Sequence, residues 1–404
     1  MICLHLAADR GLQDETRAEL LYAGLLRDAG STGLSPEAVG DIPAVASTRS
    51  NPLVRAVSRL SGDRAQSSPR LAHLSPPDRA AVVVRALGLP EGVAESVYLV
   101  DERWDGHGPG RMRGRDIPIG ARVLAVASEA ASAWERHSGE PGAGGSMDVR
   151  VDRPIDVAAI ERDLRSQHLH HLDPTLVEAI LLVGRASLWR LLCEPDLAAQ
   201  LLDLEPARYL RYSDDAHIDQ ICTTFADLVD TRTPRMGPHG ARVAALAVCV
   251  AERLGFDEIE RSELRRAGLL HDLGKLIVPI AYLEKPSELT QHERKVVNEH
   301  ARAGAAVLRR SRALAGLAPL MEAHHERLDG EGTFPAFRDE RAALAARVIA
   351  VCDRYEAMTA ERPYRGLLSP DQVWRLLEDA ALEPPARKTL IALHDVVATG
   401  LPWS

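Results

Sequence analysis

Residues Ala251 to Lys275 read AERLGFDEIERSELRRAGLLHDLGK, and residues Ala7 to Ser31 read AADRGLQDETRAELLYAGLLRDAGS. The two stretches align without a gap at an offset of 244, so that Asp28 pairs with Asp272. Both carry apolar residues at the three- and four-residue spacing of a helix that buries one face. Self-similarity of this kind predicts that one helical unit occurs twice in the chain.

Two further matches follow in the same order. DERWDGHG at 101–108 resembles HERLDGEG at 325–332, and RVLAVAS at 122–128 resembles RVIAVCD at 347–353, at offsets of 224 and 225. Chance similarity between helices rich in Ala and Leu is the alternative, but the preserved order favours a tandem repeat. We therefore predict two domains, residues 1–205 and 214–404.

The composition indicates the fold class. At 404 residues the chain is long enough for two cores, and aromatic residues make up only 4% of it. The apolar residues are mostly Ala, Leu and Val, which suit packed helices better than a sheet sandwich. We predict an all-α protein built from two tandem helical bundles.

Several classes of protein are disfavoured by charge and patterning. A formal net charge of −9 argues against a general grip on nucleic acid, which needs a basic surface. No run approaches 18 apolar residues and the N-terminus lacks signal-peptide features, so we expect a cytoplasmic protein without a membrane span. The five cysteines form no C-x-x-C pair, which favours reduced thiols.

Metal-capable side chains gather in the second copy. Each lies at the end of a predicted helix or within one, and the helices expected there are 241–254, 259–270, 291–310, 313–326 and 344–359. A lone buried histidine is usually an ordinary core residue, so the prediction rests on the set. The candidate ligands are His239, His271, Asp272, His300, His324, His325 and Asp353.

The first copy lacks most of these side chains. At the aligned positions His271 becomes Arg27, and Asp353 becomes Ser128. The pair His324 and His325 becomes Val100 and Asp101. The repeat therefore predicts that only the second copy carries a metal site.

The doublets His-Asp and His-His favour two ions over one. Adjacent residues on a helix point about 100° apart, so both members of a doublet cannot face one ion symmetrically. Imidazole and carboxylate ligands without thiolate suit Fe, Mn, Ni or Zn. Two such ions about 3.5–4 Å apart would hold a bridging hydroxide for in-line attack on phosphorus.

The second copy carries, in this order, His239, HDLGK at 271–275, His300, HHERLDGEGTF at 324–334, Asp353 and RPYR at 362–365. The order and spacing of these motifs resemble the HD-GYP family of metal-dependent phosphohydrolases across about 130 residues. The first copy looks like a degenerate unit of the same family.

The resemblance implies a phosphodiesterase that hydrolyses cyclic di-GMP at a centre of two or three metals, with Fe or Mn favoured over Ni or Zn. One ion would take His239, His271, Asp272 and Asp353. The other would take His300, His324 and His325, with Asp272 as the bridge.

The resemblance also implies roles for basic side chains. Lys275 would steady a phosphate or the nucleophilic water. Arg362 and Arg365 would contact substrate phosphates, although a solvated charge pair around Pro363 is the alternative. Glu326, beside the histidine pair, is interpreted as an outer partner of the metal ligands or as a solvated helix residue.

Two departures from the family pattern bear on the substrate. Three-metal members carry Glu four residues before the leading histidine, whereas this chain carries Arg235, which favours two ions and pGpG as the product. The Gly-Tyr-Pro signature reads Gly332, Thr333, Phe334. This leaves another cyclic dinucleotide or nucleotide phosphate open as the substrate.

A signalling scaffold is the non-enzymatic alternative. In that interpretation the first copy would serve for homodimerisation or for binding a signalling partner. The complete ligand set of the second copy argues against it, and the first copy is expected to stabilise or regulate the second.

Overall fold

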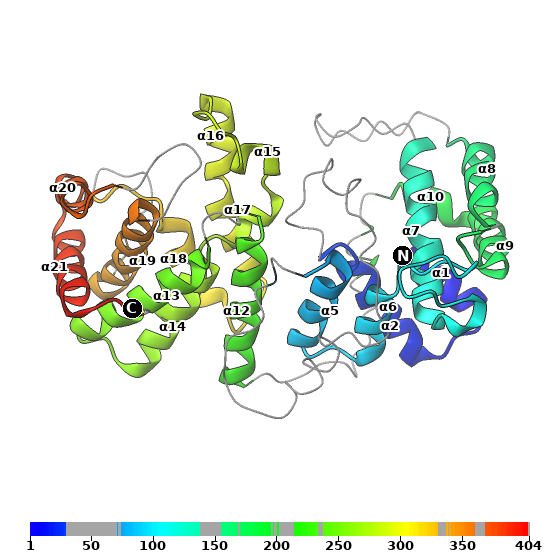
Figure 1. Ribbon diagram of the computed structural model, residues 1–404, viewed down its shortest axis with the longest axis horizontal. Helices are drawn as coiled ribbons and strands as arrows, with labels where there is room; N and C mark the ends of the chain where they lie inside the picture. Colours follow the sequence, from blue (N-terminus) through cyan, green and yellow to red (C-terminus); the bar gives the residue numbers. More distant parts are fainter. Residues whose placement is uncertain are drawn as a thin grey trace. The chain divides into compact units, whose positions relative to one another are not determined.

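A computed structural model describes residues 1–29, 71, 74–137, 155–168, 170–194, 197, 200–201, 214–232, 237–329, 337, 339–359 and 368–402. Every regular element in these ranges is a helix (Figure 1), and none of them is a strand. The predicted all-α class is confirmed. Within the same ranges no helix combines the length and the apolar character needed to cross a bilayer.

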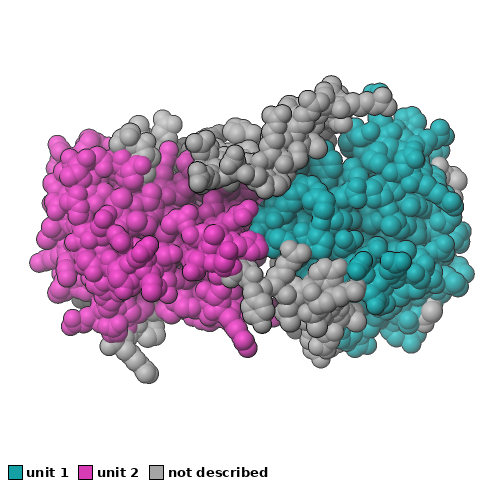
Figure 2. Space-filling model, turned by 90° about the horizontal axis from the view of Figure 1, so that it is seen from below, with its two compact units in different colours: residues 1–31, 41–67, 74–212 teal, residues 32–40, 68–73, 213–404 magenta. Residues whose placement is uncertain are grey.

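The described residues belong to two compact units, which divide between Tyr212 and Ser213 apart from two short stretches (Figure 2). Each unit has a hydrophobic core of its own. Leu124 and Ile180 are fully buried in the first, and Leu246 and Val348 in the second. The boundaries 1–205 and 214–404 themselves stay a prediction.

The first unit is a bundle of helices that pack around α7 (Ile119–His137), which contacts α1, α2, α6, α8 and α9. Its other described helices are α1 (Ile2–Asp9), α2 (Asp14–Leu26), α5 (Pro76–Ala86), α6 (Glu91–Tyr98), α8 (Val157–His168), α9 (Pro174–Val183) and α10 (Trp189–Leu191).

The second unit is organised around α13 (His239–Arg253), which packs on α12, α14, α19 and α21. Two 3₁₀ segments, Leu273–Ile277 and Ala315–Leu317, join its helices. The remaining described helices are α12 (Asp215–Asp230), α14 (Glu258–Leu270), α15 (Ile280–Leu283), α16 (Gln291–Asn298), α17 (His300–Leu308), α18 (Ala318–Ala323), α19 (Glu340–Thr359), α20 (Pro370–Ala380) and α21 (Pro384–Thr399).

The sequence repeat is visible in the helix boundaries. Helices α2 and α14 are both 13 residues long, and their ends differ by the same offset of 244 that aligns the sequences. Helix α5 likewise starts 224 residues before α17, which matches the second offset. His300, the first residue of α17, therefore has Pro76 as its counterpart.

The single helix predicted over 291–310 is wrong, because the chain breaks into α16 and α17 at Glu299. The Nδ1 atom of His300 lies 2.5 Å from the carbonyl oxygen of Val297. Val297 lies in the last turn of α16, so this contact spans the break between the two helices. The break thus coincides with the residue that turns its imidazole toward the other histidines.

Two glycines permit the close packing that brings the candidate ligands together. A Cβ on Gly268 would lie 2.7 Å from the Cα of Ala244, so the contact between α14 and α13 depends on its absence. A Cβ on Gly274 would lie 1.9 Å from the carbonyl oxygen of His300. Any larger residue at either position would push the helices, and with them the histidines, apart.

Candidate metal centre

Five helices of the second unit converge at the candidate ligands. In four of these helices the ligand is the first residue or directly follows the last one. His239 is the first residue of α13, and His271 directly follows α14. At the other end of α14, Asp257 and Glu260 form a capping box that fixes where the helix begins. His324 directly follows α18, whereas Asp353 lies inside α19.

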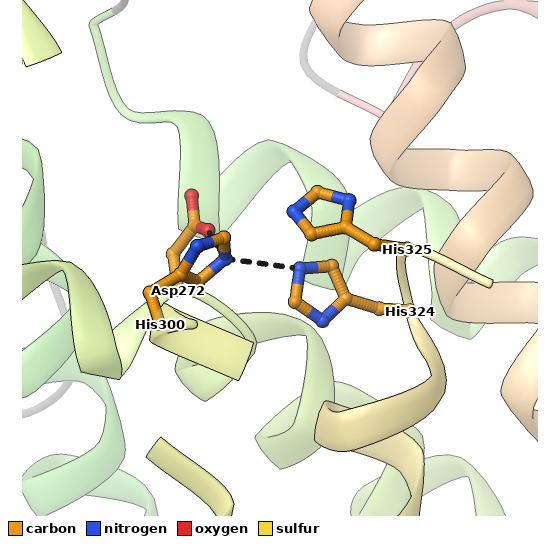
Figure 3. Close-up of side chains that lie close together, drawn as sticks. All are labelled: Asp272, His300, His324 and His325. Atoms are coloured by element: carbon orange, nitrogen blue, oxygen red, sulfur yellow. Dashed lines mark hydrogen bonds and ion pairs between the residues drawn. The ribbon is translucent and has the colours of Figure 1, made fainter. Parts of the chain in front are cut away.

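The first ligand group consists of Asp272, His300, His324 and His325, whose donor atoms lie within 4.8 Å of one another. Figure 3 shows Asp272 and His300 facing His324 and His325. The Nε2 atom of His300 lies 3.1 Å from Asp272 Oδ1 and 3.3 Å from His324 Nε2.

The second ligand group consists of His239, His271 and Asp353, whose donor atoms meet the same 4.8 Å limit. The Nε2 atoms of the two histidines are 3.2 Å apart, and His239 Nε2 lies 3.2 Å from Asp353 Oδ1. Asp272 Oδ2 approaches this group, at 3.6 Å from His239 Nε2 and 3.4 Å from His271 Nε2. Asp272 therefore presents one oxygen to each group.

Three of the histidines are oriented by their own backbone. The Nδ1 atoms of His271, His300 and His324 lie 2.8, 2.5 and 2.5 Å from the carbonyl oxygens three residues earlier. A carbonyl can only accept, so each Nδ1–H donates to it. In the neutral ring the lone pair then belongs to Nε2, which faces the other ligands.

These residues fit a pair of divalent transition-metal ions. Asp272 Oδ1 is buried and accepts no hydrogen bond from the described residues, which is costly unless a cation occupies the neighbouring space. The Nε2 atoms of His300 and His324 lie 3.3 Å apart while both Nδ1–H groups donate to carbonyls, so their lone pairs repel unless a cation lies between them. His325 borders solvent, with 44% of its side chain exposed, and the other six candidate ligands are buried.

The electrostatics leave most of these groups in the state that binds metal. Burial would raise the pKa of Asp272, but Lys275 and His271 outweigh it and hold the pKa well below its usual value. Burial lowers the pKa of His324 well below its usual value. Partial desolvation also lowers the pKa of His325, although part of its side chain reaches solvent. His239 and His271 differ. Contacts with Asp353 and Glu356 outweigh burial and raise the pKa of His239 to about 10, and the charge of Asp272 outweighs burial and raises the pKa of His271.

Metal binding should therefore release a proton. Because the pKa of the metal-free His239 is about 10, its ring is protonated at neutral pH, and a metal must displace the proton on Nε2. We expect at least one proton released per chain and an affinity that rises at least about tenfold per pH unit from pH 6 to 9. Calorimetric titration with Mn²⁺ in buffers of different ionisation enthalpy measures this release; a heat independent of the buffer would contradict it.

Two functional candidates were not found by sequence reasoning. Glu356 is 2% exposed, and its carboxylate contacts both His239 and Arg242. The sequence feature that could have identified Glu356 and Arg242 is their spacing from predicted ligands. Glu356 follows Asp353 by three residues and Arg242 follows His239 by three, which puts each pair on one helix face. The role of Glu326 stays a prediction.

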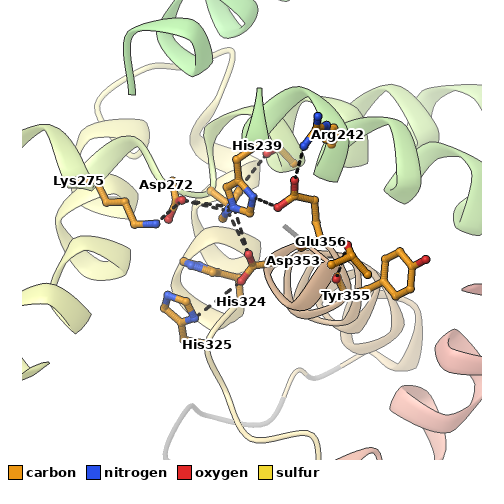
Figure 4. Close-up of polar contacts among 12 residues, drawn as sticks. His239, Arg242, Asp272, Lys275, His324, His325, Asp353, Tyr355 and Glu356 are labelled. Atoms are coloured by element: carbon orange, nitrogen blue, oxygen red, sulfur yellow. Dashed lines mark hydrogen bonds and ion pairs between the residues drawn. The ribbon is translucent and has the colours of Figure 1, made fainter. Parts of the chain in front are cut away.

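The basic residues predicted at the site divide into two groups. Lys275 Nζ lies 2.5 Å from Asp272 Oδ2, which places its ammonium beside the metal ligands (Figure 4). Arg235, Arg362 and Arg365 lie outside the described residues. The residues at the Gly-Tyr-Pro position, Gly332, Thr333 and Phe334, lie outside them as well.

The first unit shows a different arrangement at the aligned positions. Arg27, in the place of His271, pairs with Asp28 at 2.7 Å. Burial raises the pKa of Asp101, and the positive charge of Arg27 offsets part of this effect. Among the described residues of this unit no three His, Cys, Asp or Glu side chains cluster as metal ligands do.

Comparison with known proteins agrees with this geometry. The sequence profile of the HD domain matches residues 60–140 and 223–383, which fall in both copies of the repeat. A 3′3′-cGAMP-specific phosphodiesterase of Vibrio cholerae is 32% identical over 336 residues, which are 81% of this chain and 69% of that protein. The chain belongs to the HD-GYP family of HD-domain proteins. It is an HD-type metal-dependent phosphohydrolase, as its motifs predict.

Other family members resemble the chain over different spans. A cyclic di-GMP phosphodiesterase of Pseudomonas aeruginosa is 38% identical over 142 residues, or 35% of this chain and 34% of that protein. The crystal structure of a cyclic GMP-AMP-specific phosphodiesterase from V. cholerae superimposes with a TM-score of 0.61 and 26% identity. That match covers 98% of this chain and 91% of the other, so it includes both units.

Proposed function

We propose that the chain is a phosphodiesterase for cyclic dinucleotides, with cyclic di-GMP as substrate and linear pGpG as product. The observation that carries this proposal is the convergence of seven metal-capable side chains, among which Asp272 presents one oxygen to each of two groups. This arrangement suits hydrolysis of a phosphodiester, whose negative charge must be offset during attack.

In this proposal Asp272 would contribute to both of two metal sites. His239, His271 and Asp353 would hold one ion with it, and His300, His324 and His325 would hold the other. When bound, two divalent ions supply Lewis acidity to a phosphate oxygen and make water nucleophilic near neutral pH.

The chain's own residues would hold and orient the phosphodiester. Lys275, whose side chain is 15% exposed, is positioned by Asp272 and would offset charge on the phosphate as it is attacked. His325 marks the open side of the centre, where substrate would enter. Arg362 and Arg365 are proposed to contact the second phosphate, and Arg235 favours two ions over three.

A second candidate substrate is 3′3′-cGAMP. One observation favours it: the relative that matches 81% of this chain, including both copies of the repeat, is named as specific for that nucleotide. Cyclic di-GMP and 3′3′-cGAMP share a guanine nucleotide and the same linkage, so metal ligands alone do not distinguish them.

A nucleotide panel tests the proposal. Purified full-length chain with Mn²⁺ or Fe²⁺ should cleave cyclic di-GMP or 3′3′-cGAMP to a linear dinucleotide, measured by chromatography, and should spare ordinary nucleoside monophosphates. Lys275→Met should lower kcat about 10²–10³-fold, because one charge-stabilising donor is lost. Lys285→Met, which removes a lysine paired with Glu293 at 2.6 Å, is the matched control and should leave kcat unchanged.

The outcomes separate the alternatives. Cleavage of other nucleotide phosphates alone would point to a different HD phosphohydrolase. A chain that binds metal and cleaves neither the panel nor a chromogenic phosphodiester would support the scaffold interpretation.

A further inference from the structure

The buried histidines of the metal centre are not all held in the same way. His271, His300 and His324 each donate Nδ1–H to a carbonyl three residues earlier in the chain. The carbonyls belong to Gly268 in α14, Val297 in α16 and Met321 in α18. The backbone therefore sets both the tautomer and the ring orientation of these three histidines.

His239 is held in another way. It is the first residue of α13, and its Nδ1 atom points toward α19. Its Nδ1 atom instead lies 2.5 Å from Glu356 Oε2, a carboxylate on α19 (Figure 4). Glu356 occupies the place that a main-chain carbonyl takes for the other three.

Arg242 holds the second oxygen of the same carboxylate. Its Nη1 atom lies 3.2 Å from Glu356 Oε1, and Glu356 lies between Arg242 and His239 in Figure 4. Helix α13 thus supplies His239 and Arg242, and α19 supplies Asp353 and Glu356. With both oxygens engaged, Glu356 cannot turn away from the imidazole without breaking an ion pair.

From this geometry we propose that Glu356, fixed by Arg242, is the positioning residue that directs His239 Nε2 into the metal centre. The inference rests on the metal centre of the proposed function, but not on the identity of the substrate. Asp353, His271 and Asp272 surround the Nε2 atom that Glu356 aims, so its effect should fall on the ion held by these residues. The ion held by His300, His324 and His325 should be affected little.

The alternative is that Glu356 and Arg242 form an ion pair that only ties α13 to α19. Such a pair would contribute to the stability of the fold whether or not metal is present. A positioning role would appear in metal affinity, because outer partners of ligating histidines typically contribute about 10–100-fold to affinity.

The test measures the metal affinity of the full chain carrying Glu356→Gln. The affinity is determined by competition with a chromogenic chelator for Mn²⁺ or Co²⁺. We expect two classes of ion in the wild type, one of which binds about 10–100-fold more weakly in the variant while the other is unchanged. With Co²⁺, the ligand-field absorption of the affected ion should also shift.

Glu383→Gln is the matched control. Glu383 forms an ion pair with Arg347 of α19, both partners are largely buried, and neither residue is among the candidate ligands. This variant should lower the melting temperature of the metal-free chain and leave both metal affinities unchanged. Arg242→Met provides a second test if Glu356→Gln fails to fold, with the expected loss confined to the same ion.

Wild-type affinity for both ions in Glu356→Gln, or a loss no larger than in Glu383→Gln, would overturn the proposal. A wild-type chain that binds no metal would overturn it as well. Two bound ions without cleavage of any dinucleotide would refute the proposed function alone, since the affinity comparison does not involve substrate.

Discussion

Asp272→Asn should lower kcat for the cyclic dinucleotide by at least about 10³-fold, equivalent to about 4 kcal/mol of transition-state stabilisation by the metals. The reason is geometric, because Asp272 Oδ1 faces His300 while Oδ2 faces His239 and His271. Removing its charge weakens both ligand groups at once. Steady-state kinetics with saturating Mn²⁺ measures the effect.

Asp219→Asn is the control for this variant. Asp219 pairs with Arg266 at 2.6 Å and with Arg265 at 3.0 Å, and it is not a candidate ligand. It should cost about 1 kcal/mol of stability and leave kcat unchanged. If Asp272→Asn kept more than a tenth of the wild-type kcat, Asp272 could not bridge the centre.

Removal of metal should abolish activity and destabilise one unit selectively. Each ion present at 100 times its Kd stabilises the folded state by about 2.7 kcal/mol, so the loss of two ions corresponds to about 10–20 °C in Tm for a domain of this size. Differential scanning calorimetry with and without chelator should show that shift in one transition only. The other transition should stay in place, because the described part of the first unit holds no comparable ligand cluster.

Adding Mn²⁺ or Fe²⁺ back to the stripped chain should restore both the activity and the Tm. Activity that survived exhaustive chelation, or equal shifts in both transitions, would argue against a metal centre confined to the second unit.

Much of the fold could be predicted from the repeat. Its offset of 244 carries the boundaries of α2 onto those of α14, because the same apolar spacing recurs in both stretches, although α2 lacks the capping box of α14. The convergence of His239, His300 and Asp353 could also be predicted, since metal ligands of a recognised motif must meet in space whatever their separation in sequence.

The orientation of the ligands could not be predicted in the same way. The break at Glu299 coincides with the contact of the His300 imidazole with the Val297 carbonyl, and helical periodicity contains no information about that contact. Glu356 was not identified from the sequence because a glutamate in an Ala-rich helix is ordinarily solvated, and the tertiary contact of α13 with α19 buries it.

The central claim is that the second unit holds two divalent ions, and the metal content of the purified chain tests it most directly. Mass spectrometry of the wild type, loaded with Mn²⁺ or Fe²⁺ and dialysed, should find about two ions per chain. Asp272→Asn should retain fewer than one. A folded wild-type chain that retained no metal, or that retained as much as Asp272→Asn, would contradict the account.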